Sequence, residues 1–171
     1  MKVKIPIYAV SIGLVLILQT TLIEHITIWN IKPNLPIIFI ISAAFLNGNT
    51  EGAVVGLATG LALDMTVGKL IGLNGLLGLY LGIVTGQVNK KFYRENLLVM
   101  AFLTFVCSLV YEFLVYFITG IETGNYHWLY ALRFVILPVS VYNGLASLLV
   151  HSVNIRVFRR LNQTGRTWRK F

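Results

Sequence analysis

Six apolar runs, separated by short polar breaks, cover most of the chain. They occupy residues 5–23, 35–46, 52–67, 70–88, 97–118 and 134–153. An α-helix rises about 1.5 Å per residue and a hydrocarbon core is about 30 Å thick, so one crossing needs about 20 apolar residues. The pattern therefore predicts an all-α polytopic membrane protein with six transmembrane helices.

The second and third runs are expected to form a short helical hairpin around the polar break at residues 47–51. The second run has only twelve residues, too few to cross a bilayer unaided. Such a hairpin either lies in a thinned part of the bilayer or is buried among the other helices, and the sequence leaves both options open. Pro138 predicts a kink in the sixth helix. Residues 119–133 are expected to form a loop with aromatic side chains at the membrane surface.

The composition indicates that lipid, rather than water, surrounds the chain. Hydrophobic residues make up 57% of the 171 positions and charged residues only 12%, and the mean hydropathy is +0.79. Soluble domains carry about 25% charged residues, so this chain has too few polar groups to cover a water-facing surface. Six spans would use nearly the whole length and leave no room for a soluble catalytic domain. The first run is expected to be a retained helix, because no small-residue cleavage site follows it.

Basic residues gather at the chain ends and in one loop. With the N-terminus inside and six crossings, eleven Lys and Arg residues fall on the inner side and three on the outer side. Because positive charge favours the cytoplasmic side, we expect both termini to be cytoplasmic. Residues 1–155 would form the transmembrane domain and residues 156–171 a basic tail lying on anionic headgroups. This topology accounts for the net charge of +8, so no nucleic-acid partner is expected.

Glycines recur every fourth residue in the third and fourth runs. Positions four apart lie on nearly one face of a helix, so each run would present a strip without side chains. Small residues at this spacing let two helices approach backbone to backbone. The strips either pack the two runs against each other or form a groove for another protein's helix or a small ligand. The glycines concerned are Gly52, Gly56, Gly60, Gly78, Gly82 and Gly86.

Two acids lie inside apolar runs, where a charge is costly. Asp64, the only aspartate, continues the glycine spacing of the third run. It could bond the chain break that follows the run, pair with a cation such as Lys69 or Arg133, or bind a substrate or proton. Glu112 is the second acid. The topology puts both acids in the outer half of the bilayer, where a cluster of Asp64, Glu112 and Arg133 is geometrically feasible.

No catalytic or metal-binding pattern emerges from the sequence. A single aspartate excludes an aspartyl intramembrane protease, and the chain has neither a Gly-x-Ser-x-Gly elbow nor a P-loop. His25, His127 and His151 lack metal-ligand spacing and are expected to be polar residues at the membrane interfaces. Cys107, the only cysteine, is expected to be a small buried residue. We therefore expect no enzyme activity, no metal and no cofactor.

One stretch of the chain resembles the MreD family, the small membrane protein of the bacterial rod-shape (elongasome) system. The resemblance rests on Lys32-Pro33-Asn34-Leu35, the short apolar run after it, and the series Gly56-x3-Gly60-x3-Asp64-x3-Gly68-x3-Gly72. The length and the basic ends agree as well. The specific match covers residues 32–86, and the rest of the chain matches in hydropathy.

The resemblance implies properties that the residues alone do not. The protein would be a non-catalytic component of the bacterial cytoplasmic membrane that binds the bitopic protein MreC and supports lateral peptidoglycan synthesis. It would act indirectly with RodA, its penicillin-binding transpeptidase and MreB. Its fold would be similar to the substrate-binding subunit of energy-coupling-factor transporters. That likeness supplies the alternative function, a membrane subunit binding a vitamin or metal, which would dock through Ala9-x3-Gly13 and hold its solute with polar residues of the outer loops. The candidates there are Asn30, Asn34, Asn125, Tyr126, His127 and Trp128.

Overall fold

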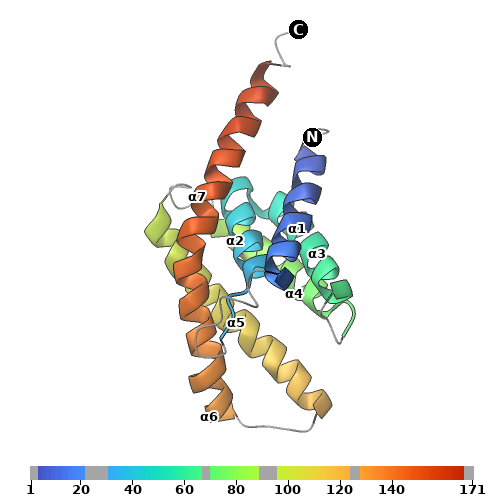
Figure 1. The fold of residues 1–171 in the computed structure, drawn as a ribbon, viewed down its shortest axis with the longest axis vertical. Helices are drawn as coiled ribbons and strands as arrows, with labels where there is room; N and C mark the ends of the chain where they lie inside the picture. Colours follow the sequence, from blue (N-terminus) through green and yellow to red (C-terminus); the bar gives the residue numbers. More distant parts are fainter. Residues whose placement is uncertain (1–3, 22–30, 67–69, 89–95, 124–127, 168–171) are drawn as a thin grey trace.

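The computed structural model describes residues 4–21, 31–66, 70–88, 96–123 and 128–167, with side chains in the last helix as far as Val157. This part of the chain is all-helical (Figure 1). The elements are α1 (Lys4–Thr21), α2 (Leu35–Asn47), α3 (Asn49–Thr66), α4 (Leu73–Val88), α5 (Leu97–Thr123), α6 (Trp128–Ala131), a π-helical turn η1 (Leu132–Ile136) and α7 (Leu137–Thr167). Because α6, η1 and α7 follow one another without a break, they form one long rod.

Helix α2 is the centre of the fold. It contacts α1, α3, α4, α5 and α7, and every residue from Pro36 to Leu46 is buried. A helix that is apolar on all sides must be covered on all sides, and here protein rather than lipid covers it. For α2, burial among the other helices is therefore correct, whereas α3 keeps one side exposed. Within this hairpin only α2 is short: it has 13 residues, whereas α3 has 18.

The ends of α2 are fixed by local chemistry. The side chain of Asn34 caps the helix by accepting a hydrogen bond from the backbone N–H of Ile37, as N-cap residues commonly do. At the other end Gly48 has φ 94°, a left-handed conformation that glycine adopts without strain. The chain can therefore reverse at once into α3.

Among the residues that the structure describes, two helical segments are long and apolar enough to cross a membrane, Leu97–Ile121 and Leu129–Val157. Three shorter apolar helices accompany them: Ile5–Thr21, Leu35–Asn47 and Leu73–Val88. The start of α1 and the end of α7 lie at the same end of the molecule (Figure 1). An even number of crossings would produce this arrangement.

The region between the fifth and sixth runs differs from the prediction. The loop expected at residues 119–133 is wrong in extent, because α5 continues to Thr123 and helix resumes at Trp128. The hydroxyl of Thr119 donates to the carbonyl oxygen of Val115 at 2.7 Å, so this polar residue is satisfied inside a helix. Residues 124–127 lie outside the described part of the chain.

Pro138 is accommodated by η1. Proline has no N–H to give to the carbonyl oxygen four residues earlier, here that of Phe134, and its ring crowds that carbonyl. The π-helical turn at Leu132–Ile136 lies immediately before it, and such turns are a recognised way to absorb this conflict. The α7 backbone stays helical as far as Thr167.

Candidate functional site

The glycine strips of α3 and α4 face each other. A Cβ added to Gly56 would lie under 3.0 Å from the carbonyl oxygen of Gly78, and one added to Gly78 would meet Gly56 in the same way. Gly52 and Gly82 form a second such pair, and Gly60 contacts the backbone of Asn74. Backbone therefore touches backbone along the whole contact, as small residues at this spacing permit.

All six predicted glycines belong to this internal contact. Gly86 completes it against Asn49, and every one of the six is buried. Helix α2 closes the third side, because Ala44 and Ile40 approach Gly52 and Gly56. Between the two readings of the glycine spacing, the structure places the strips in the packing of α3 on α4, with no open space left along them.

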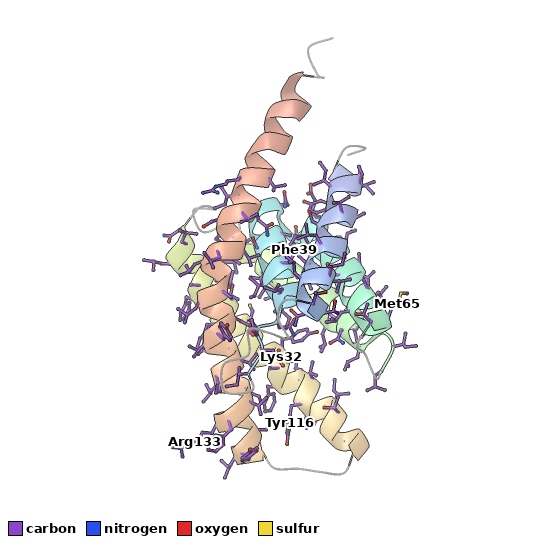
Figure 2. All side chains as sticks on the ribbon, viewed as in Figure 1. Lys32, Phe39, Met65, Tyr116 and Arg133 are labelled. Carbon is purple, nitrogen blue, oxygen red and sulfur yellow. The ribbon has the colours of Figure 1, made fainter. Side chains whose placement is uncertain are left out.

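The sides of α3 and α4 that point away from this contact are apolar and exposed. Tyr80 is two positions from Gly78 and two positions from Gly82, and an offset of two positions corresponds to about 200° around a helix. Tyr80 is 59% exposed, and Met65 on α3 is 80% exposed. Figure 2 shows Met65 projecting from the edge of the molecule. These exposed sides of α3 and α4 point in opposite directions, one on each side of the pair. We call the two sides together the α3–α4 outer face; its residues are Val54, Leu57, Leu61 and Met65 on α3 and Leu76, Tyr80 and Val84 on α4.

Asp64 closes the turn between α3 and α4. Its side chain is buried and accepts four hydrogen bonds, all from residues at the start of α4. Oδ2 receives the backbone N–H groups of Gly72 at 2.9 Å and Gly75 at 3.1 Å. Oδ1 receives the backbone N–H and the side-chain amide of Asn74 at 3.2 and 2.7 Å.

These bonds explain how a carboxylate is tolerated at this depth. The first N–H groups of a helix have no partner within it, and the helix dipole favours negative charge there. Asp64 therefore caps α4 from the neighbouring helix. Gly72, in the turn itself, has φ 98°, which accounts for a glycine at this motif position. Gly68 and Lys69 lie outside the described residues.

Asn74 and Tyr111 extend the cap to α5. Asn74 donates its amide to Asp64, and its side-chain oxygen accepts the hydroxyl proton of Tyr111 at 2.5 Å. Three helices are thereby joined by one chain of hydrogen bonds. Neither residue was predicted from the sequence; the signal that could have found Asn74 is an amide placed two residues after a turn glycine at the start of an apolar run.

Glu112 belongs to a second polar network, centred on the family motif at the start of α2. The side-chain amide of Asn34 donates to Glu112 Oε1 at 3.3 Å, and its backbone N–H donates to Asn143 Oδ1 at 2.7 Å. Asn143 in turn donates to Ser108 Oγ at 2.5 Å. Gln19 on α1 holds the same segment through the carbonyl oxygen of Pro33 and the N–H of Leu35. Pro33 and Asn34 therefore tie α1, α5 and α7 to the end of the central helix.

Arg133 does not join the two acids. It lies in η1, its guanidinium is 5.8 Å from the centre of the Phe134 ring, and it is exposed. Figure 2 shows it projecting from the opposite side of the molecule to Met65. Among the described residues the three members of the proposed cluster have separate partners: the start of α4 for Asp64, Asn34 for Glu112 and Phe134 for Arg133.

One face of α7 carries buried polar residues that the sequence analysis did not single out as a group. Ser140, Asn143, Ser147 and His151 are all 0% exposed, and their spacing of three or four places them on one helix face. That periodicity is the signal that could have found them. The prediction for His151 is wrong, since it is fully buried with Nδ1 2.8 Å from Ser42 Oγ. His25 and His127 lie outside the described residues.

Within the described ranges, no three His, Cys, Asp or Glu side chains gather as a metal site would require. Cys107 is buried in α5. The polar side chains inside the bundle instead bond to one another across helices, as polar residues do when they stabilise helix contacts in lipid. What the geometry provides is a rigid bundle with an apolar exterior.

These features define the class: a polytopic α-helical membrane protein whose buried polar groups connect its helices. Within that class, the family model for the rod shape-determining protein MreD matches residues 2–159, nearly the whole chain. The chain belongs to the MreD family and is a membrane component of the cell-shape system. No curated protein and no solved structure gives a significant match.

Proposed function

We propose that this chain is a non-catalytic component of the rod-shape complex, and that it holds a bitopic membrane protein of the MreC type through the α3–α4 outer face. In this role it supports lateral peptidoglycan synthesis and is linked indirectly to RodA, the penicillin-binding transpeptidase and MreB. The observation that carries the proposal is the backbone-to-backbone contact of α3 and α4, in a chain of the MreD family.

The physical reason is preorganisation. Helix association in lipid depends on close van der Waals contact, because lipid is as apolar as the helices. Two helices in backbone contact, with their turn fixed by four bonds to Asp64, form a rigid pair that loses little freedom when a third helix packs on one of its outer sides. The exposed residues of the outer face are apolar apart from the Tyr80 hydroxyl, which suits the transmembrane helix of a partner.

The absence of catalysis is part of the same proposal. Asp64 is engaged with four donors and Glu112 with Asn34. Hydrogen bonds that hold backbone and amide groups in place are structural bonds. They favour a protein that positions its partners over one that transforms a substrate.

The proposed topology has six crossings with both termini cytoplasmic. Eleven basic residues on one side against three on the other support this orientation. The common end of α1 and α7 supports an even number of crossings (Figure 1). Since the other helices cover α2 on all sides, its short length need not match the thickness of the bilayer.

A solute-binding subunit is the alternative function, and one observation favours it. Gly13 has nothing within 4 Å of an added Cβ, and Ala9 is exposed, so the small-residue pair of α1 is open for docking. Against it, Asn34, the described candidate for holding a solute, is bonded to Glu112 and Asn143. Depletion in cells separates the functions: rounding of rods supports the cell-shape role, and a growth defect rescued by a nutrient supports the alternative.

A bulky substitution on the outer face tests the proposed contact. Leu76, 55% exposed on α4, is replaced by Trp, which remains compatible with lipid but prevents close approach of a partner helix. We expect roughly tenfold less MreC-type protein to co-purify, equivalent to a loss of about 1.4 kcal/mol. The control is Leu145→Trp on α7, where the side chain is 62% exposed. Equal recovery of the partner with both variants would rule out the α4 side of the outer face as the contact.

A further inference from the structure

A small cleft lies at the end of the bundle where α1 begins and α7 ends. Its floor is α2, one wall is formed by Tyr8 and Ser11 of α1, and the other by Asn154 and Val157 of α7. The cleft has a volume of about 30 Å³. It lies at the opposite end of α2 from the Asn34 network and away from the α3–α4 outer face.

Three side chains at this cleft, Asn47, Asn154 and Tyr8, offer hydrogen-bond acceptors, and the hydroxyl of Ser11 can donate or accept. Asn47 Oδ1 is buried and has no donor within the described residues, while its amide nitrogen donates to Ala43 O at 2.9 Å. Asn154 uses its amide nitrogen on Ser42 Oγ at 2.9 Å, which leaves its side-chain oxygen for a ligand. Tyr8 gives its hydroxyl proton to Glu51 Oε2 at 2.9 Å, so its oxygen presents lone pairs.

A buried acceptor without a donor is unfavourable, so a group that donates several hydrogen bonds stabilises this arrangement. A primary ammonium has three donors and no acceptor, as a lysine side chain does. A water molecule needs about 10–15 Å³ of such space, so the cleft accommodates two or three groups of that size. A primary ammonium fits, whereas three methyl groups on the nitrogen would both overfill the cleft and remove every donor.

We propose that this cleft binds the primary ammonium headgroup of an aminophospholipid such as phosphatidylethanolamine, taken from the leaflet on the side where α1 begins and α7 ends. The lipid source follows from the position of the cleft at the membrane-facing exterior of α1 and α7, whose exposed residues nearby are apolar, among them Val10 and Val153. The headgroup nitrogen donates to Asn47 Oδ1, Asn154 Oδ1 and Tyr8 Oη.

The test is native mass spectrometry of the purified full chain with equal amounts of phosphatidylethanolamine and phosphatidylcholine of identical acyl chains. Because hydrogen bonds to a charged group are stronger than those between neutral groups, we expect the ethanolamine lipid to be retained roughly tenfold or more over the choline lipid. Equal retention of the two lipids by the unmodified chain would overturn the proposal.

Two variants fill the cleft, each with a control on the same helix. Ser11→Leu fills it from α1, with Ala9→Leu at an exposed position as control. Val157→Trp closes it from α7, where Val157 is 39% exposed, with Val153→Trp at a 56% exposed position as control. We expect both filling variants to lose the ethanolamine preference and both controls to keep it. If Ser11→Leu does not fold, the result for Val157→Trp decides. A folded filling variant that keeps its preference for the ethanolamine lipid would contradict the proposal.

Discussion

Replacing Gly56 by Leu is expected to separate α3 from α4 while leaving the chain in the membrane. The new side chain would meet the backbone of Gly78 at under 3.0 Å, and backbone of a packed helix cannot move aside as a flexible side chain can. Overpacking costs about 1–3 kcal/mol when side chains can adjust and more when they cannot, so we expect a loss of at least about 3 kcal/mol. Thermal unfolding of the purified protein, followed by size-exclusion chromatography, measures it.

The matched control is Gly13→Leu, the same substitution in the middle of α1. Gly13 has nothing within 4 Å of an added Cβ, and leucine has a higher helix propensity than glycine, so the melting temperature should stay the same or rise. The amount of protein in the membrane should be normal for both variants. Equal melting temperatures for Gly56→Leu and Gly13→Leu would show that the glycine contact does not hold the bundle together.

Removing the carboxylate of Asp64 is expected to have the second large effect. In Asp64→Leu the N–H groups of Gly72, Asn74 and Gly75 and the amide of Asn74 lose their acceptor. Unsatisfied buried donors cost about 1–3 kcal/mol each; because the turn relaxes and the terms are not additive, we expect a total loss of about 3–5 kcal/mol. Loss of rod-shape complementation should accompany the lower melting temperature.

The isosteric variant Asp64→Asn separates a structural role from a chemical one. Its side-chain oxygen can still accept hydrogen bonds from some of the four N–H groups that bond to Asp64. Its NH2 group is itself a donor and cannot accept hydrogen bonds from the others. We therefore expect a smaller loss, about half that of Asp64→Leu, with much of the cell-shape function retained. If Asn and Leu both abolish function completely while Asn leaves the melting temperature intact, the charge itself is required and the capping account is wrong.

Local periodicity is what made the α3–α4 contact predictable. Residues four apart share a helix face whatever the rest of the chain does, so the glycine strips could be recognised without knowing their neighbour. The break after Asp64 was foreseen for the same reason, because the turn lies close by in the sequence. The hairpin of α2 and α3 followed from the short polar segment between them.

The polar networks could not be predicted in this way, because they join residues far apart in the chain. Asn34 and Asn143 are separated by 109 positions, as are Ser42 and His151. No local pattern specifies which helices become neighbours. Once the structure sets α5 and α7 side by side, with Gly144 near the backbone of Ala101, the buried polar face of α7 acquires its partners.

The π-helical turn η1 changes the helix face on which Arg133 lies. In a regular helix Arg133 would share a face with Ser140, seven residues later, with an offset of about 20°. Ser140 is buried, yet Arg133 is exposed. The π-helical turn at Leu132–Ile136 contains five residues and turns less per residue than an α-helix. It therefore rotates the residues before Pro138 out of register with α7.

Photo-crosslinking in native membranes tests the central claim, that the glycine-packed α3–α4 pair presents the surface on which the partner's helix lies. A benzophenone amino acid is placed at Leu57 of α3 or Leu76 of α4, and in separate chains at Phe102 of α5 or Leu145 of α7, all of them exposed. Leu57 and Leu76 lie on opposite sides of the pair, so the account predicts covalent adducts with an MreC-type protein from at least one of these two positions and none from the other two. Adducts from Phe102 or Leu145 alone would contradict it.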